Sequence, residues 1–267
     1  MSDRSQDGME TAEYPPEQDR SESEDEETQQ GEREMAFLDH LEELRWRILK
    51  ALAAVVVGAI LCFSFSDYLL HVLTAPIRSI GPPLKLIFLH PVGMFLVRLE
   101  LSLVSGLVLA LPIVLYQAWQ FIAPGLLKQE RRYVLPVIFL TLLCFLVGAS
   151  LAYWVVIPIA LRFLSGMGTA DIAPQFDIGK YIGFLLRLIV AFGLVFELPM
   201  VSYFLTKMGI LTPAFMRRAR KYAVIGVFVI AAVLTPPDIF SQLMMAVPLL
   251  GLYEISILVC GLAAQER

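Results

Sequence analysis

Long stretches without a charged side chain constrain this chain more than any other feature of its sequence. No Asp, Glu, Lys or Arg occurs between Glu100 and Lys128, and a second uncharged stretch runs from Tyr133 to Leu161. Each exceeds the roughly 20 residues that a helix needs to cross the hydrocarbon core of a bilayer. The composition agrees, because 57% of the residues are hydrophobic and 17% are charged, against about 45–50% and about 25% in soluble domains. A water-soluble globular enzyme is therefore excluded.

The first 34 residues have a different composition from the rest of the chain. They contain thirteen acids and three arginines, a net charge of −10, whereas residues 35–267 contain eighteen bases and twelve acids, a net charge of +6. A segment so acidic and so poor in large apolar side chains cannot bury enough surface to offset its chain entropy. It also lacks the apolar core of a secretory signal and is too acidic for a transit peptide. We expect a disordered acidic tail over 1–34, a membrane domain over 35–260 and a short tail over 261–267.

The uncharged stretches predict an all-α integral membrane protein with six transmembrane helices. The first four are expected at about 46–65, from about 93, within 133–161 and between 180 and 207. The adjacent Pro236 and Pro237 cannot lie inside a helix, so they split the next stretch into a hairpin. Its first arm, Tyr222–Leu234, has 13 residues, about 20 Å against a core of roughly 30 Å. Either the hairpin is re-entrant or the membrane thins around it.

The distribution of Lys and Arg predicts the orientation of the segments. With the amino terminus inside, the cytoplasmic segments carry twelve of these residues and the outer loops carry four. Short cytoplasmic loops are enriched in Lys and Arg. We therefore expect both termini in the cytoplasm of a multi-pass protein.

No sequence pattern of an enzyme or a metal site is present. The phosphate-binding GxxxxGK[ST], the zinc-binding HExxH and the nucleophile GxSxG patterns are all missing from the sequence. The histidines are His40, His71 and His90, and the cysteines are Cys62, Cys144 and Cys260. Neither set has metal-ligand spacing, and the cysteines are interpreted as small buried apolar residues. We expect no catalytic residue, metal, cofactor or nucleic-acid partner.

Three glutamates stand in positions that call for an explanation. Glu197 lies ten residues before Lys207, about 15 Å from that boundary and near the middle of the bilayer. A charge at that depth costs at least ~2.5–3.5 kcal/mol. Glu197 is therefore either functional or a protonated side chain hydrogen-bonded within the bundle. Glu43 and Glu130 are expected at the cytoplasmic interface, where either could also be a first-turn acid favoured by the helix dipole.

Four strings in the chain resemble the TatC family, the multispanning receptor subunit of the twin-arginine protein translocase. They are HLEELRWR (40–47), FIAPGLLKQERR (121–132), FGLVFELP (192–199) and LTPPDIFSQ (234–242). The resemblance covers about residues 36–260 in the family's order and spacing, and the acidic tail lies outside it.

The resemblance implies a role for each matching residue. The signal-peptide site corresponds to Glu43, Arg45, Phe121 and Glu130. Glu197 corresponds to the family's intramembrane glutamate, on the concave face of a glove-shaped six-helix bundle whose fifth and sixth helices are short. Partner-binding polar positions correspond to Thr235 and Gln242, and structural motif positions to Pro76, Pro236, Pro237 and Asp238.

The resemblance also implies the function. Such a chain exports folded proteins across the bacterial cytoplasmic membrane with the proton-motive force and without a nucleotide. Its expected partners are TatB-like and TatA-like single-span subunits, twin-arginine signal peptides, further copies of itself and the lipid bilayer. Adjacent guanidinium groups can each fork onto a carboxylate, which lysine cannot imitate. The alternative function is a proton-coupled secondary transporter that uses Glu197.

Overall fold

The computed structural model describes residues 17–78, 86–122, 134–166, 175–235 and 238–265. These residues are almost entirely helical, in agreement with the expected all-α class. The exception is a pair of two-residue parallel strands, β1 (Leu86–Ile87) and β2 (Phe176–Asp177). The chain forms two compact units, Met1–Trp46 and Arg47–Arg267. The expected boundaries at residues 34 and 260 stay predictions.

Helix α1 runs from Glu17 to Ser64 and so crosses the boundary between the two units. Its first turns belong to the acidic segment for which the composition predicted disorder. Glu, Gln and Arg are good helix formers, and no proline follows Pro16 before Pro76. The local propensity of this segment therefore favours a helix even though the segment has few apolar side chains to pack.

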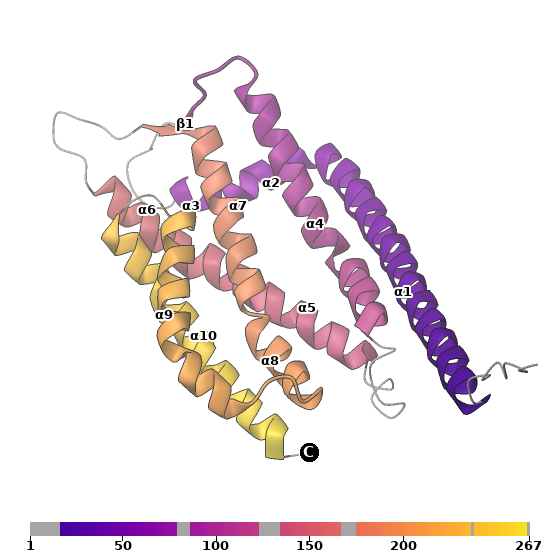
Figure 1. Cartoon of the computed structure of the whole chain (residues 1–267). Helices are drawn as coiled ribbons and strands as arrows, with labels where there is room; N and C mark the ends of the chain where they lie inside the picture. The colour runs from indigo at the N-terminus through magenta and orange to yellow at the C-terminus, as the bar shows by residue number, and fades with distance from the viewer. Residues whose placement is uncertain (1–16, 79–85, 123–133, 167–174, 236–237, 266–267) are drawn as a thin grey trace, which may run out of the picture. The chain divides into compact units, whose positions relative to one another are not determined.

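The second unit contains the remaining helices, shown in Figure 1. In chain order they are α2 (Ser66–Leu73), α3 (Ala75–Arg78), α4 (Gly93–Ile122), α5 (Val134–Leu151), the π-helical turn η3 (Ala152–Val156), α6 (Ile157–Ser165), α7 (Ile178–Val195), α8 (Leu198–Lys207), α9 (Pro213–Leu234) and α10 (Ile239–Gln265). Helices α5, η3 and α6 follow one another without a break, and so form one long segment.

Five helical segments of the described chain are long and apolar enough to cross a membrane. They are Leu41–Ser64, Gly93–Phe121, Leu135–Ser165, Ile178–Lys207 and Ile239–Gln265. They correspond to the first, second, third, fourth and sixth predicted segments.

The predicted fifth segment corresponds to α9, which is not among those five. Helix α9 has 22 residues, but its first turns carry four bases and only Tyr222–Leu234 is uncharged. Helix α10 has 27 residues, so the expectation of a short sixth helix needs a correction. Its stretch before Glu254 is short, but an apolar stretch follows Glu254 and continues the helix to Gln265.

Helix α7 forms the centre of the buried core in the second unit. Its side chains Ile182, Leu185, Leu188 and Phe192 are at most 1% exposed. It contacts α4, α5, α9 and α10, and Figure 1 shows it between α4 and α9. This central packing fixes the backbone that leads directly to Glu197.

Two close helix contacts depend on glycine. A Cβ atom on Gly58 of α1 would lie 2.7 Å from the carbonyl oxygen of Gly106 in α4, and one on Gly193 of α7 would clash with the ring of Phe145 in α5. Small residues let helix backbones approach closely in membranes, where apolar surface alone does not drive helices together. These glycines therefore set how closely α1 approaches α4 and α7 approaches α5.

Helix α2 is held to the bundle by two tyrosines. The hydroxyl of Tyr153 in η3 donates to the carbonyl of Val72 at 2.7 Å, and the hydroxyl of Tyr181 in α7 donates to the carbonyl of Leu73 at 2.9 Å. These carbonyls belong to the last turn of α2, where a helix leaves its carbonyl groups without an amide partner four residues on. The expected motif residue Pro76 is buried in the adjacent α3.

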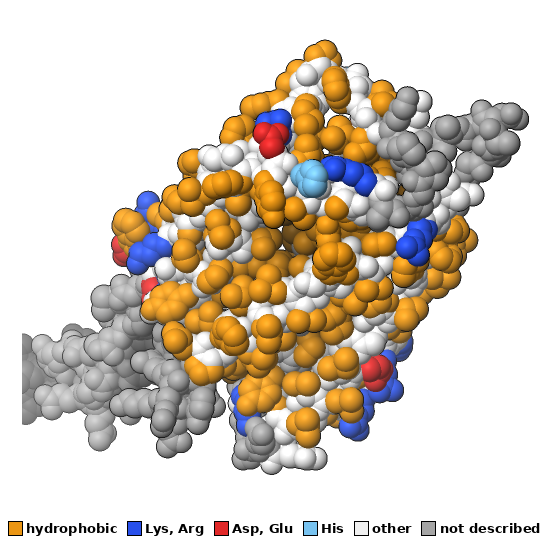
Figure 2. All heavy atoms as spheres, turned by 180° about the vertical axis from the view of Figure 1, so that it is seen from behind, with side chains coloured by type: hydrophobic (Ala, Val, Ile, Leu, Met, Phe, Trp, Pro, Cys, Tyr) orange, Lys and Arg blue, Asp and Glu red, His pale blue; other side chains and the backbone are white. Residues whose placement is uncertain are grey.

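The outer surface of the bundle is largely apolar. Figure 2 shows apolar side chains over the middle of one face, with charged side chains toward its margins. Exposed large side chains such as Trp154 (74%), Val233 (76%) and Leu258 (68%) belong to this surface. Such a surface is stable only where lipid or protein covers it.

Candidate functional site

Glu197 lies at a break between two helices rather than within one continuous helix. Helix α7 ends at Val195 and α8 begins at Leu198, with Pro199 in the first turn of α8. Proline has no amide hydrogen, and its ring clashes with the carbonyl four residues earlier, here that of Val195. Pro199 therefore explains why the predicted fourth segment breaks where Glu197 lies.

The carboxyl of Glu197 lies near the backbone of Phe145 in α5 and makes no well-formed hydrogen bond within the described chain. The side chain is only partly exposed, and neither of its buried oxygens has a hydrogen-bond partner among the described residues. The neighbouring Phe196 packs against α5, where a Cβ atom on Gly148 would lie 2.7 Å from its ring. A functional Glu197 and a protonated side chain hydrogen-bonded within the bundle therefore both stay predictions.

The structure describes three of the four predicted signal-peptide residues. Glu43, which is partly buried, and Arg45, which is exposed, lie on the part of α1 in the unit Met1–Trp46. Phe121 is partly buried at the end of α4, in the second unit. Glu130 lies outside the described residues. The expectation that these side chains form one site stays a prediction.

A polar network that the sequence did not predict lies beside Phe121. Nη1 of Arg47 donates to Oε1 of Gln120 at 2.7 Å, and Nε2 of Gln120 donates to the hydroxyl of Tyr116 at 2.6 Å. Tyr116 and Gln120 are four residues apart, so they lie on one face of α4. The network joins α1 at Arg47, the first residue of the second unit, to the end of α4, where Phe121 lies. The only sequence signal for it was a basic residue and two polar ones at expected segment ends.

The polar residues of the α9–α10 hairpin already have partners within the chain. The hydroxyl of Thr235 donates to the carbonyl of Ala231 at 2.9 Å, and Nε2 of Gln242 donates to the carbonyl of Phe228 at 3.0 Å. Oδ1 of Asp238 accepts from the amide of Ser241 at 2.6 Å, which caps the start of α10. Pro236 and Pro237 lie outside the described residues, and the helices end and begin on either side of them, as predicted.

One oxygen and one hydroxyl in this hairpin remain without a partner among the described residues. They are Oδ2 of Asp238 and Oγ of Ser241, both buried. Phe240 in the same turn stacks on Phe163 of α6, with ring centroids 4.0 Å apart. The hairpin is thus attached to α6 by an aromatic contact and to itself by hydrogen bonds.

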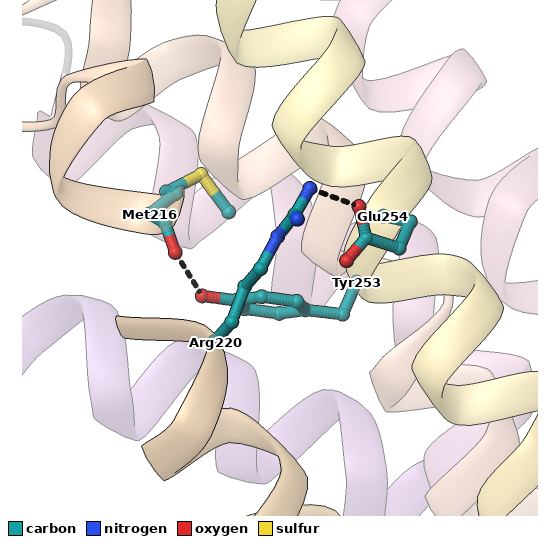
Figure 3. Close-up of polar contacts among 4 residues, drawn as sticks. All are labelled: Met216, Arg220, Tyr253 and Glu254. Carbon is teal, nitrogen blue, oxygen red and sulfur yellow. Dashed lines mark hydrogen bonds and ion pairs between the residues drawn. The ribbon is translucent and has the colours of Figure 1, made fainter. Parts of the chain in front are cut away.

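The other ends of α9 and α10 are joined by two polar contacts, shown in Figure 3. The hydroxyl of Tyr253 donates to the carbonyl of Met216 at 2.8 Å, and Nη2 of Arg220 lies 2.7 Å from Oε2 of Glu254. Both members of the ion pair are about half exposed, so the pair itself contributes ~0.2–1 kcal/mol. The adjacent residues Tyr253 and Glu254 of α10 therefore contact two residues of α9, Met216 and Arg220, that lie one helical turn apart.

Two other features carry no predicted site residue. A cavity of about 280 Å³ lies between the starts of α4 and α7, with His90, Glu100, Asp177 and Lys180 among its lining residues. Cys260 is fully buried beside Thr206, with Sγ 2.9 Å from the hydroxyl. No group of three or more His, Cys, Asp or Glu side chains that could hold a metal occurs in the described part of the chain.

Known proteins resemble the chain over most of its length. A family model for "Sec-independent protein translocase protein (TatC)" matches residues 39–248. The TatC protein of Carboxydothermus hydrogenoformans is 42% identical over 84% of this chain and 92% of its own length. That of Aquifex aeolicus is 40% identical over 87% of this chain and 98% of its own length.

The fold matches a solved structure as well. The crystal structure of a "Twin Arginine Translocase Receptor- TatC" superposes with a TM-score of 0.78 at 41% identity, over 84% of this chain and 99% of that one. The match confirms the all-α membrane fold, and the five apolar spans agree with a multi-pass protein of a bacterial membrane. The family model covers residues 39–248, and both the sequence and the fold agree with it. The chain therefore belongs to the TatC family of Sec-independent protein translocase proteins.

Proposed function

We propose that this chain is the core and the signal-peptide receptor of a twin-arginine translocase, which exports folded proteins across the cytoplasmic membrane with the proton-motive force. The observation that carries the proposal is the family match over residues 39–248. That range contains all four strings of the resemblance, and with them Glu43, Glu130 and Glu197. The family match gives no support to the alternative of a proton-coupled transporter.

The proposed receptor site recognises two adjacent arginines by their geometry. Each guanidinium donates two parallel hydrogen bonds to one carboxylate, Glu43 or Glu130, whereas a lysine ammonium offers only a point charge. Ion pairs that water can reach are worth only ~0.2–1 kcal/mol each, so two of them cannot hold a cargo by themselves. The apolar part of the signal must therefore be buried as well, and the end of α4 at Phe121 is the expected place.

The network beside Phe121 has a supporting role in this proposal. Gln120 accepts from Arg47 and donates to Tyr116, so it keeps the start of the second unit's α1 segment against the end of α4. A receptor that must align two carboxylates needs such a fixed frame, because misplacement by about 1 Å weakens recognition.

Orientation and assembly belong to the same proposal. The excess of Lys and Arg on one side supports cytoplasmic termini. We expect TatB-like and TatA-like single-span subunits to bind near Thr235 and Gln242, and we expect copies of the chain to associate. The chain itself supplies binding and a path for cargo, and no catalytic step is assigned to it.

The experiment that tests the receptor role is site-specific photo-crosslinking to a twin-arginine signal peptide from an aromatic photoprobe at position 121, which leaves Glu130 in place. We expect a crosslink that a twin-lysine peptide does not give. With a probe at Phe121, Glu130→Lys should abolish crosslinking by like-charge repulsion, and Glu130→Gln should weaken it less because one acceptor oxygen remains.

The chain offers a matched control for this charge reversal. Glu254→Lys also reverses an acid that lies next to bases, but Glu254 pairs with Arg220 between α9 and α10. It should leave the crosslink intact. Equal loss in both variants would mean that the Glu130 effect is a general effect of charge, and unchanged crosslinking in Glu130→Lys would remove this site from the proposal.

A further inference from the structure

Three exposed bases lie close together on the first turns of α9. Arg217, Arg218 and Lys221 are all exposed, and their positions i, i+1 and i+4 span about 100° of the helix surface. We call these three residues the α9 basic cluster. None of them forms an ion pair with another described residue, in contrast to Arg220, whose Nη2 lies 2.7 Å from Oε2 of Glu254.

The α9 basic cluster adjoins the surface that faces lipid. On the same side as Arg218, the helix carries a stripe of exposed apolar and aromatic side chains. Its members are Tyr222 (66%), Ile225 (62%), Val229 (57%) and Val233 (76%). Nζ of Lys221 lies 4.9 Å from the centroid of the Tyr222 ring. Aromatic rings beside Lys or Arg are typical of the level at which lipid head groups lie.

The charge balance around the cluster favours an anion. Among the described residues of the second unit, the acid on the packed neighbour α10 is Glu254, and Arg220 already occupies it. Three like charges within one turn and a half repel one another unless a counter-charge binds between them. A phosphate diester has the charge for this, and two arginines can each fork onto its oxygens.

We propose that Arg217, Arg218 and Lys221 form a binding site for the phosphate of an anionic phospholipid. The acyl chains of this lipid lie along the stripe from Tyr222 to Val233. The site rests only on the chain spanning a bilayer, which the family and the apolar helices establish. It does not depend on the receptor role. A bound lipid here would fix the depth of α9, whose uncharged part is too short to fix it alone.

Quenching by brominated lipids tests this site directly. Tyr222→Trp places one fluorophore beside the cluster, in a background where Trp46, Trp119 and Trp154 are replaced by phenylalanine. In mixed vesicles, brominated phosphatidylglycerol should quench this tryptophan more than its mole fraction predicts, and brominated phosphatidylcholine should not. Arg217→Gln, Arg218→Gln and Lys221→Gln should each lower the preference by about fivefold.

Two further variants separate a built site from a general charge effect. Arg217→Lys with Arg218→Lys keeps the charge but removes both forks, and it should also lower the preference. Arg162→Gln with Lys180→Gln removes two exposed bases elsewhere in the chain and should leave it unchanged. If the Tyr222→Trp protein keeps all three bases and its quenching by brominated phosphatidylglycerol only follows the mole fraction of that lipid, the proposal is wrong.

The acidic tail is the rival occupant. If a lipid preference emerged only after deletion of residues 2–33, the tail would be the cluster's partner and the lipid proposal would be wrong. Should the tryptophan-free background not fold, mass spectrometry of the intact wild-type chain under native conditions, with phosphatidylglycerol or phosphatidylcholine added, gives the same comparison. Equal retention of the two lipids would then count against the site.

Discussion

Two polar sites in the apolar helices differ in how their side chains are partnered. In the α9–α10 hairpin, the hydroxyl of Thr235 and the amide of Gln242 both donate to backbone carbonyls of α9. At the α7–α8 break, both oxygens of Glu197 lack a hydrogen-bond partner among the described residues. The hairpin groups stabilise the fold, whereas the Glu197 carboxyl contributes no such bond.

The difference suggests separate roles for the two sites. A buried polar group without a partner costs about 1–3 kcal/mol, and more if it is charged. A buried carboxyl without a well-formed hydrogen bond among the described residues is expected to interact with something outside the described chain, such as water, cargo or another subunit. The hairpin groups have less capacity for a partner than the resemblance implied, since their donors are already in use.

The largest expected effect is that of Glu197→Ala. Because the buried carboxyl makes no well-formed hydrogen bond within the described chain and such burial is costly, its loss should not lower the thermal stability of the purified protein. If the carboxyl binds a group of cargo or of a partner during transport, one such bond to a charged group is worth ~1.5–3 kcal/mol, so export should slow by about ten- to hundredfold. Signal-peptide binding should persist. Export of a reporter protein and a thermal melt measure the two effects.

Two other substitutions at the same position decide what the carboxyl does. Glu197→Gln keeps a polar group and should be nearly functional if hydrogen bonding is what matters, whereas a full loss would show that ionisation is needed. Glu197→Leu should behave like the alanine variant. Wild-type export with leucine at this position would end the assignment of any transport role to Glu197.

The second largest effect concerns stability rather than transport. Asp238 caps α10 through Oδ1, which accepts from the amide of Ser241 at 2.6 Å. Loss of such a cap costs about 0.5–2 kcal/mol. Asp238→Ala should therefore lower the free energy of unfolding by about 1 kcal/mol, measured by denaturation in mixed micelles. Asp238→Asn keeps an acceptor oxygen and should lose much less, and an equal loss in both would contradict the capping role.

Sequence reasoning predicted the membrane segments because charge and apolar length are local properties. The uncharged stretches placed five long helices, and Pro236 with Pro237 placed the turn between α9 and α10. The break beside Glu197 was missed because one proline, Pro199, can either kink a membrane helix or be tolerated in it. The expectation of a short sixth helix came from the resemblance, and it was wrong because α10 continues through Glu254, which pairs with Arg220, to Gln265.

The predicted site residues were identified by type, and their partners were not predicted. The hydrogen-bond partner of Gln242 is a backbone carbonyl fourteen residues away, and that of Arg47 is Gln120, seventy-three residues away. Neither separation leaves a periodic signal in the sequence. The hydroxyls of Tyr153 and Tyr181 meet carbonyls of α2 for the same unpredictable reason, which is the arrangement of helices in the tertiary fold.

The third prediction concerns Gln242. Its amide joins α10 to the Phe228 carbonyl of α9, and such bonds between membrane helices are worth ~0.6 kcal/mol on average and up to ~1.7 kcal/mol. Gln242→Leu should lower stability by about that amount and should also reduce copurification of the single-span partner. Gln265→Leu, at the other end of α10, is the control and should change neither. If Gln242→Leu lowers stability but the partner copurifies as with the wild type, then the Gln242 side chain stabilises the hairpin and does not bind the partner.

The smallest expected effect is that of Thr235→Val, which tests whether a partnered group can also serve a partner subunit. The carbonyl of Ala231 accepts from both the amide and the hydroxyl of Thr235, each at 2.9 Å. Valine keeps the amide bond and the shape of the side chain, so the free energy of unfolding should fall by less than ~0.6 kcal/mol. Thr235→Ala removes a methyl group as well from a side chain that is 8% exposed, and it should cost more because it leaves a void.

If the hydroxyl also accepts a hydrogen bond from a partner subunit, Thr235→Val should lower copurification of that partner while the thermal melt stays almost unchanged. If copurification falls only as much as stability does, and equally in the alanine variant, then Thr235 stabilises the hairpin and does not bind the partner. Glu197 would then be the polar group of this comparison with a functional role.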